Sequence, residues 1–109
     1  MTRGLFVAML LAACGGSDVS RTVGAECNAN GDCDEQCLMG GHYPNGFCSV
    51  SCDNDDGCPS ETHCIEDMGG VCLFACNFDS DCEFLGQGYT CVMIGVHASN
   101  TMVKVCRAD

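Results

Sequence analysis

Apolar residues follow two patterns along this chain. Near the N-terminus they form one continuous run, Leu5 to Leu11. Beyond it they come in short groups separated by polar and glycine-rich stretches, and no segment keeps a helical period over three turns. Two of these groups, residues 92–94 and 102–105, flank the polar pair Ser99-Asn100, which predicts a β-hairpin. The pattern therefore predicts short strands and little helix.

A recurring ending predicts two more strands. Residues 46–48 (Gly-Phe-Cys) and 70–72 (Gly-Val-Cys) each follow a turn-forming sequence and place an apolar residue between glycine and cysteine. This order is typical of a strand that returns from a turn.

Cysteine, rather than a large apolar core, is expected to hold the fold together. The chain has 109 residues, 13 of them cysteine, and no tryptophan. A cysteine content above about a tenth predicts a disulfide scaffold. Twelve of the cysteines form three sets of four: Cys27, Cys33, Cys37 and Cys48; Cys52, Cys58, Cys64 and Cys72; Cys76, Cys82, Cys91 and Cys106. The fold class predicted is small and disulfide-rich, with three tandem four-cysteine units, short β-hairpins and little helix.

The three sets define the units. Each set opens with five residues between its first two cysteines, and the sets recur at a nearly constant period of about 25 residues, which indicates a repeated module. The units span residues 27–48, 52–72 and 76–106, within a disulfide-rich domain of residues 27–109.

Three residues, here called a connector, separate one unit from the next: residues 49–51 and 73–75. We expect disulfides within the units and none across a connector, that is, neither Cys48–Cys52 nor Cys72–Cys76. Four extended steps of about 3.3 Å place such a pair near 13 Å apart, beyond the roughly 7 Å limit for a bridge. The connector strand would then be shared, so that the units stack instead of hanging as separate beads.

The N-terminal run has the features of an export signal. Arg3 precedes it, and the run is too short to cross a bilayer, which needs about 20 apolar residues. It ends in residues 11–14 (Leu-Ala-Ala-Cys), which resemble the bacterial lipoprotein box. The resemblance implies that residues 1–13 are a signal peptide and that Cys14 carries the lipid. Parity supports it, because setting Cys14 aside leaves an even number of cysteines. The alternative is an ordinary secretory signal with a chance cysteine.

Residues 14–26 are expected to comprise the lipidated Cys14 and a flexible tether, because they show no apolar periodicity. Gly15 follows the lipid cysteine. In the sorting rule of enteric bacteria, aspartate at that position retains a lipoprotein in the inner membrane. Because glycine stands there instead, the rule implies delivery to the outer membrane.

The spacing of the first unit resembles the finger modules of colipase- and Dickkopf-like folds, and the first four cysteines of EGF-like modules. Those families pair the first cysteine with the third and the second with the fourth. The resemblance implies the pairs Cys27–Cys37, Cys33–Cys48, Cys52–Cys64, Cys58–Cys72, Cys76–Cys91 and Cys82–Cys106, although four cysteines allow three connectivities. The whole chain resembles the cysteine-rich surface lipoproteins of myxobacterial-type genomes.

The five residues between the first two cysteines of each unit, here called the opening loop, carry Asn or Asp at the first and third positions. Such side chains close local turns onto backbone N–H groups. Residues 53–57 (Asp-Asn-Asp-Asp-Gly) also suggest a calcium loop, but they lack the EF-hand register and its final glutamate, so turns are favoured. Zinc at the closely spaced cysteines, with His42 and His63 nearby, is disfavoured because exported thiols pair with each other.

No motif favours catalysis or a bound cofactor. His42, His63 and His97 are scattered, no serine lies in a nucleophile-elbow pattern, and no C-x-x-C redox motif is present. We therefore expect that the protein is not an enzyme.

The charge of the chain excludes one class of partner. The formal net charge is −11, and more negative once Arg3 is removed, so that phosphate backbones of nucleic acids are repelled. The function expected is a lipid-anchored, extracytoplasmic cysteine-rich lipoprotein with a structural or binding role at the cell envelope, toward an unknown protein or envelope ligand. The alternative is a secreted inhibitor-like or calcium-binding module, with Leu38–Phe47 or Val96–Met102 as its contact loop.

Overall fold

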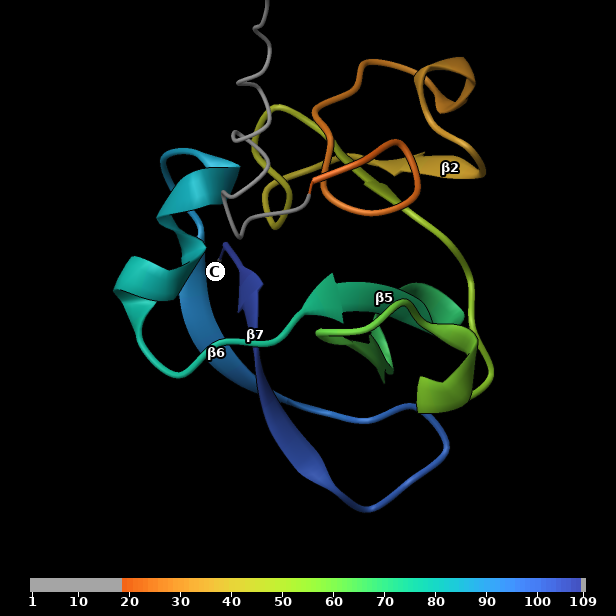
Figure 1. Ribbon diagram of the computed structural model, residues 1–109, viewed down its shortest axis with the longest axis vertical. Coiled ribbons are helices and arrows are strands. Elements are labelled where there is room, and N and C mark those ends of the chain that lie inside the picture. Colours follow the sequence, from red (N-terminus) through yellow and green to blue (C-terminus); the bar gives the residue numbers. More distant parts are fainter. Residues whose placement is uncertain (1–18, 109) are drawn as a thin grey trace, which may run out of the picture.

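The computed structural model describes residues 19–108. These residues form six strands in three two-stranded antiparallel sheets, and their helices are all of the 3-10 type. The strands are β2 (Gln36–Leu38), β3 (Phe47–Ser49), β4 (Thr62–Ile65), β5 (Val71–Phe74), β6 (Thr90–Gly95) and β7 (Met102–Arg107). The 3-10 helices are η1 (Asn30–Asp32), η2 (Asp55–Gly57), η3 (Asp67–Gly69) and η4 (Asp79–Leu85). The predicted fold class is confirmed (Figure 1).

Each unit contains one hairpin and two disulfides. The hairpins are β2–β3, β4–β5 and β6–β7, and the last of them is the one that the apolar pattern predicted around Ser99-Asn100. The six disulfides are Cys27–Cys37, Cys33–Cys48, Cys52–Cys64, Cys58–Cys72, Cys76–Cys91 and Cys82–Cys106. These are the pairs that the resemblance to finger modules implied.

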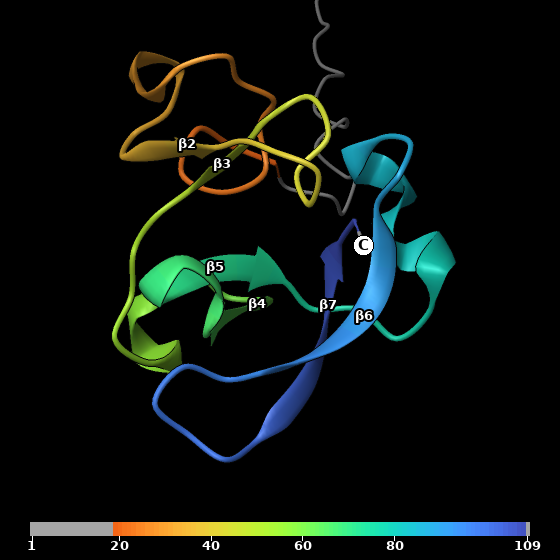
Figure 2. The ribbon, with the colours of Figure 1, turned by 180° about the vertical axis from the view of Figure 1, so that it is seen from behind.

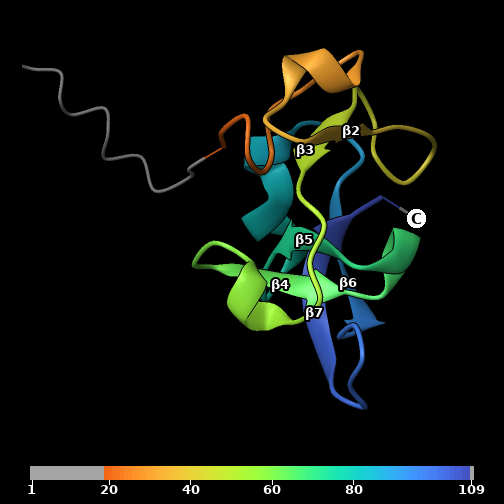
Figure 3. The same cartoon turned by 90° about the vertical axis from the view of Figure 1, so that its right-hand side faces the viewer.

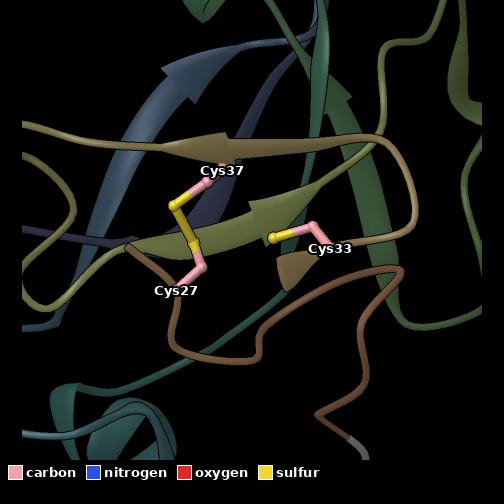
Figure 4. Close-up of side chains that lie close together, drawn as sticks. All are labelled: Cys27, Cys33 and Cys37. Carbon is pink, nitrogen blue, oxygen red and sulfur yellow. A yellow bond between two sulfur atoms is a disulfide. The ribbon is translucent and has the colours of Figure 1, made fainter. Parts of the chain in front are cut away.

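The two disulfides of a unit clamp its opening loop across its hairpin. The third and fourth cysteines of each unit are direct cross-strand partners, as in the pair Cys37 and Cys48. The first cysteine bonds to one strand and the second to the other. Figure 4 shows this geometry in the first unit, where Cys27 reaches Cys37 on β2 and Cys33 lies beside them.

Each connector between units makes an isolated β-bridge to the hairpin of the next unit, so the units stack as predicted. After β3 the chain continues along β5, where Ser51 bridges Val71 and the N–H of Cys52 donates to the carbonyl of Gly70 at 3.1 Å. After β5 it continues along β7, where Ala75 bridges Val105. Every cysteine that flanks a connector is bonded within its own unit.

The third unit also returns to the first one. The N–H of Ala108 donates to the carbonyl of His42 at 3.0 Å, and the hydroxyl of Tyr89 donates to the carbonyl of Pro44 at 3.1 Å. The C-terminal end of β7 therefore lies near the loop between β2 and β3, as Figure 2 shows. The three units enclose a common centre.

That centre is a single small core. Phe47 is fully buried and its ring packs against those of Tyr43, Phe74 and Tyr89, at centroid distances of 5.9, 6.4 and 6.0 Å. These rings form one cluster with Ile65 and Val71 of the second unit. Because all three units contribute to this cluster, no unit buries its apolar face alone. The remaining fully buried aliphatic residues are Leu38, Ile65, Val71, Leu73 and Val105.

The tether prediction is wrong for residues 20–26, which are folded against the first unit. The N–H of Gly24 donates to the carbonyl of Cys48 at 2.8 Å, and the N–H of Cys48 donates to the carbonyl of Ala25 at 2.9 Å. Val23 is 2% exposed. The folded domain thus begins before Cys27. The predicted signal peptide (residues 1–13), Cys14 and residues 15–18 lie outside the described residues.

Candidate functional site

The side chain at the third position of each opening loop makes a hydrogen bond to a residue distant in the sequence. Asn30, Asp55 and Asp79 each accept a hydrogen bond from the backbone N–H of the third cysteine of their own unit, at 2.8–2.9 Å. These bonds span 7, 9 and 12 residues, so they are not the local turns that the sequence suggested. They fasten each opening loop to its hairpin.

The fifth position closes the local turn instead. Asp32 accepts from the N–H groups of Asn28 and Ala29, at 2.9 and 3.3 Å, and Asp81 makes the same pair of bonds in the third unit, at 2.8 and 3.0 Å. The second unit has Gly57 there. Its turn is closed by the Asn54 side chain, which accepts from the N–H of Asp56 at 3.0 Å.

These bonds explain the acidic loop that resembled a calcium site. In residues 53–57, one carboxylate oxygen of Asp55 accepts from the N–H of Cys64, and the other lies 2.9 Å from Nδ1 of His63. Burial acts to raise the pKa of Asp55, but the hydrogen bonds from His63 and Cys64 outweigh it and lower that pKa. Both oxygens of the Asp55 carboxylate are therefore engaged in bonds that fasten the loop to its hairpin, while Asn54 closes the local turn.

The loop carboxylates predict acid sensitivity. The pKa values of Asp81 and Glu35 are also lowered, by hydrogen bonds from Asn77 and Phe78 N–H to Asp81 and from Ser51 to Glu35. Depressed pKa values contribute stability above the unfolded-state value of about 4, and that stability is lost as the pH falls through the lower folded-state values. We therefore expect a lower melting temperature at pH 3 than at pH 7, with the disulfides intact.

Circular dichroism melts in about 0.15 M salt, which partly screens the net charge, measure this effect. The variant Asp81→Asn keeps an acceptor oxygen without titrating, so its melting temperature should depend less on pH than that of the unchanged chain. An equal or higher melting temperature at pH 3 would contradict the prediction.

Cysteines form three clusters that resemble metal-binding sites, each with three sulfur atoms within 4.8 Å of one another. They are Cys27, Cys33 and Cys37; Cys52, Cys58 and Cys72; and Cys76, Cys82 and Cys106. Every one of these sulfurs belongs to a disulfide. Figure 4 shows the first cluster with its Cys27–Cys37 bond. A metal would need thiolates, so the clusters are junctions of paired disulfides.

The three histidines each have a separate structural contact. Nδ1 of His42 lies 2.8 Å from the carbonyl of Ala108, and His63 pairs with Asp55. The contact of His97 is made by its backbone N–H, which donates to the carbonyl of Cys64 at 2.8 Å. These contacts tie the C-terminus and the β6–β7 turn to the rest of the domain.

One polar cluster that the sequence did not reveal joins all three units. The Tyr43 hydroxyl donates to Oδ2 of Asp67, which also pairs with the Arg107 guanidinium at 3.3 Å. Burial and this bond raise the pKa of Tyr43, so its phenol remains a donor. Nothing in the chain's local pattern marks these residues, which lie far apart in sequence.

Both proposed contact loops have exposed residues, but they differ in how their large apolar side chains are placed. In Leu38–Phe47 the side chains of Leu38, Tyr43 and Phe47 are buried in the core. In Val96–Met102, residues 98–102 are all exposed at the turn of the β6–β7 hairpin. Met93 and Met102, 57% and 56% exposed, lie on one face of that hairpin, diagonally across its strands.

Comparison of the chain with protein-family models, with curated proteins and with solved structures gives no significant match. Within residues 19–108, no helix has the length and apolar character needed to cross a membrane.

Proposed function

We propose that this protein is a lipid-anchored, extracytoplasmic module of the bacterial cell envelope with a binding role. The observation that carries the proposal is the use of its cysteines. All twelve cysteines in the described part of the chain are paired, and the thirteenth, Cys14, stands at the end of the sequence that resembles a lipoprotein box. The stable pairing of six disulfides fits an oxidising compartment.

Lipid on Cys14 would supply the attachment. Several acyl chains, each contributing about 0.8 kcal/mol per buried methylene, anchor a small domain almost permanently. Gly15 after the lipid cysteine supports delivery to the outer membrane, and the arrangement supports the likeness to cysteine-rich surface lipoproteins. We infer a binding role and not catalysis, because the side chains of His42, His63 and Asp55 are engaged in structural contacts.

The β6–β7 hairpin is the element that we propose contacts a partner. The disulfides at Cys91 and Cys106 hold its base, while its turn and both exposed methionines extend beyond them. Methionine side chains adapt to varied apolar surfaces. The second candidate, a secreted inhibitor, is favoured by the same exposed turn. Partition into detergent separates the two candidates, because only the lipid-anchored form enters the detergent phase.

Replacing the lipid cysteine tests the anchor directly. We expect Cys14→Ser to abolish labelling by a radioactive fatty acid and to leave the precursor uncleaved, because the thiol that accepts the lipid is gone. The six disulfides should form as before, since Cys14 takes part in none of them. Ala12→Ser, which keeps a small residue in the box, is the matched control and should label normally. Label on the Cys14→Ser chain would refute the assignment.

A further inference from the structure

The folded domain starts close to the proposed lipid. Residues from Ser20 onward are hydrogen-bonded to the domain, so only residues 15–18 separate Cys14 from Val19. Five residue steps span at most about 18 Å, whatever their conformation. Because acyl chains hold Cys14 at the bilayer interface, Val19 cannot lie much farther than this from the lipid headgroups. The surface around Val19 is therefore held within this reach of the membrane.

That surface carries an exposed apolar patch. Val19 is 46% exposed and Phe84, in η4, is 37% exposed. Both line a shallow hollow that also includes Gly24 and Leu85. The ring of Phe84 packs edge-on against the buried ring of Phe74, with centroids 5.2 Å apart. The patch is thus held in place by the core.

The charge around the patch selects the kind of lipid. Glu26 and Glu83 line the same hollow, and both are exposed. With a net charge of −11 the chain is repelled by anionic membranes. We propose that the patch of Val19 and Phe84 docks onto a zwitterionic phospholipid surface, and that it turns the β6–β7 hairpin away from the membrane. Figure 3 shows the beginning of the described chain beside η4, with the turn between β6 and β7 at the far end of the domain.

This inference rests on the proposed lipidation of Cys14. An experiment with a chemically attached lipid tests docking of the patch separately from natural lipidation. A maleimide phospholipid can be coupled to Cys14 of the chain from residue 14 onward, because the other cysteines are paired. The chain has no tryptophan, so Phe84→Trp introduces a single fluorescent probe into the patch. Met102→Trp places the matched control at a similarly exposed site on the distal hairpin.

On vesicles of brominated phosphatidylcholine we expect the Phe84→Trp emission to fall by about half, since docked apolar groups enter the headgroup–acyl boundary. The Met102→Trp emission should be unchanged. Adding Val19→Ser to Phe84→Trp should weaken the quenching. Equal quenching at both sites, or none at either with the protein bound to vesicles, would overturn the docking proposal. Neither result bears on natural lipidation, which the fatty-acid labelling of Cys14 tests separately.

Discussion

Reduction of all six disulfides is expected to unfold the domain at room temperature. The disulfides close loops with separations of 10 to 24 residues. Each such loop contributes about 3 kcal/mol by restricting the unfolded chain. Six contributions of this size exceed the roughly 5–15 kcal/mol by which a domain is ordinarily stable. The small shared core around Phe47 cannot make up that difference.

Unfolding on reduction should also be cooperative across the three units. Residues of all three units, among them Phe47, Val71 and Tyr89, lie in one core, so that a reduced unit removes packing from its neighbours. Two-dimensional amide NMR during titration with a reductant measures both points, and the oxidised chain in the same buffer is the control. Dispersed amide signals after full reduction would show that the disulfides are not essential. Three separate transitions would show that the units are independent.

Gly46→Ala is expected to destabilise the domain by about 3 kcal/mol. Gly46 has φ +80°, and a Cβ added there would overlap the carbonyl oxygen of Cys27. A left-handed conformation costs an ordinary residue roughly 1–2 kcal/mol, and forcing an atom into packed backbone costs about 1–3 kcal/mol more. Gly70 has the same relation to Cys52 in the second unit, so Gly70→Ala should behave in the same way.

Thermal unfolding of the oxidised chains measures this effect. For a domain of this size the expected loss corresponds to a fall in melting temperature of roughly 15 °C. Gly41→Ala is the matched control, because Gly41 lies in the same loop with no atom within 4 Å of the added Cβ, and its melting temperature should hardly change. A Gly46→Ala chain as stable as Gly41→Ala would contradict the steric argument.

Much of the covalent framework could be predicted because it is local. The spacing of Cys27, Cys33, Cys37 and Cys48 indicates one module, and the reach of an extended chain excludes a bridge across a connector. The glycine before Phe47 marked a strand returning from a turn. Its second role, the close approach to the Cys27 carbonyl, depends on another part of the unit and was not visible in the sequence.

The candidate site was less predictable, because its contacts join distant residues. The acidic opening loops resembled local turns or a calcium loop, yet Asp55 and Asp79 bond to N–H groups that only the hairpins bring near them. Residues 20–26 have the composition of a tether, but backbone hydrogen bonds to Cys48 fold them onto the domain. Composition cannot report a backbone bond that any residue can make.

The sequence by itself determined the repeated units and the short hairpins, because each of these depends on spacing within about 25 residues. The pairing inside each unit was implied by the resemblance to finger modules, since four cysteines allow three connectivities. Only the tertiary structure decided how the units close on one another. Tyr43, Asp67 and Arg107 come from three different units and meet only when the C-terminus returns to the first. The tertiary structure alone also decided that the domain begins near Ser20, which shortens its distance to Cys14. Both outcomes follow from contacts between surfaces that no local pattern encodes.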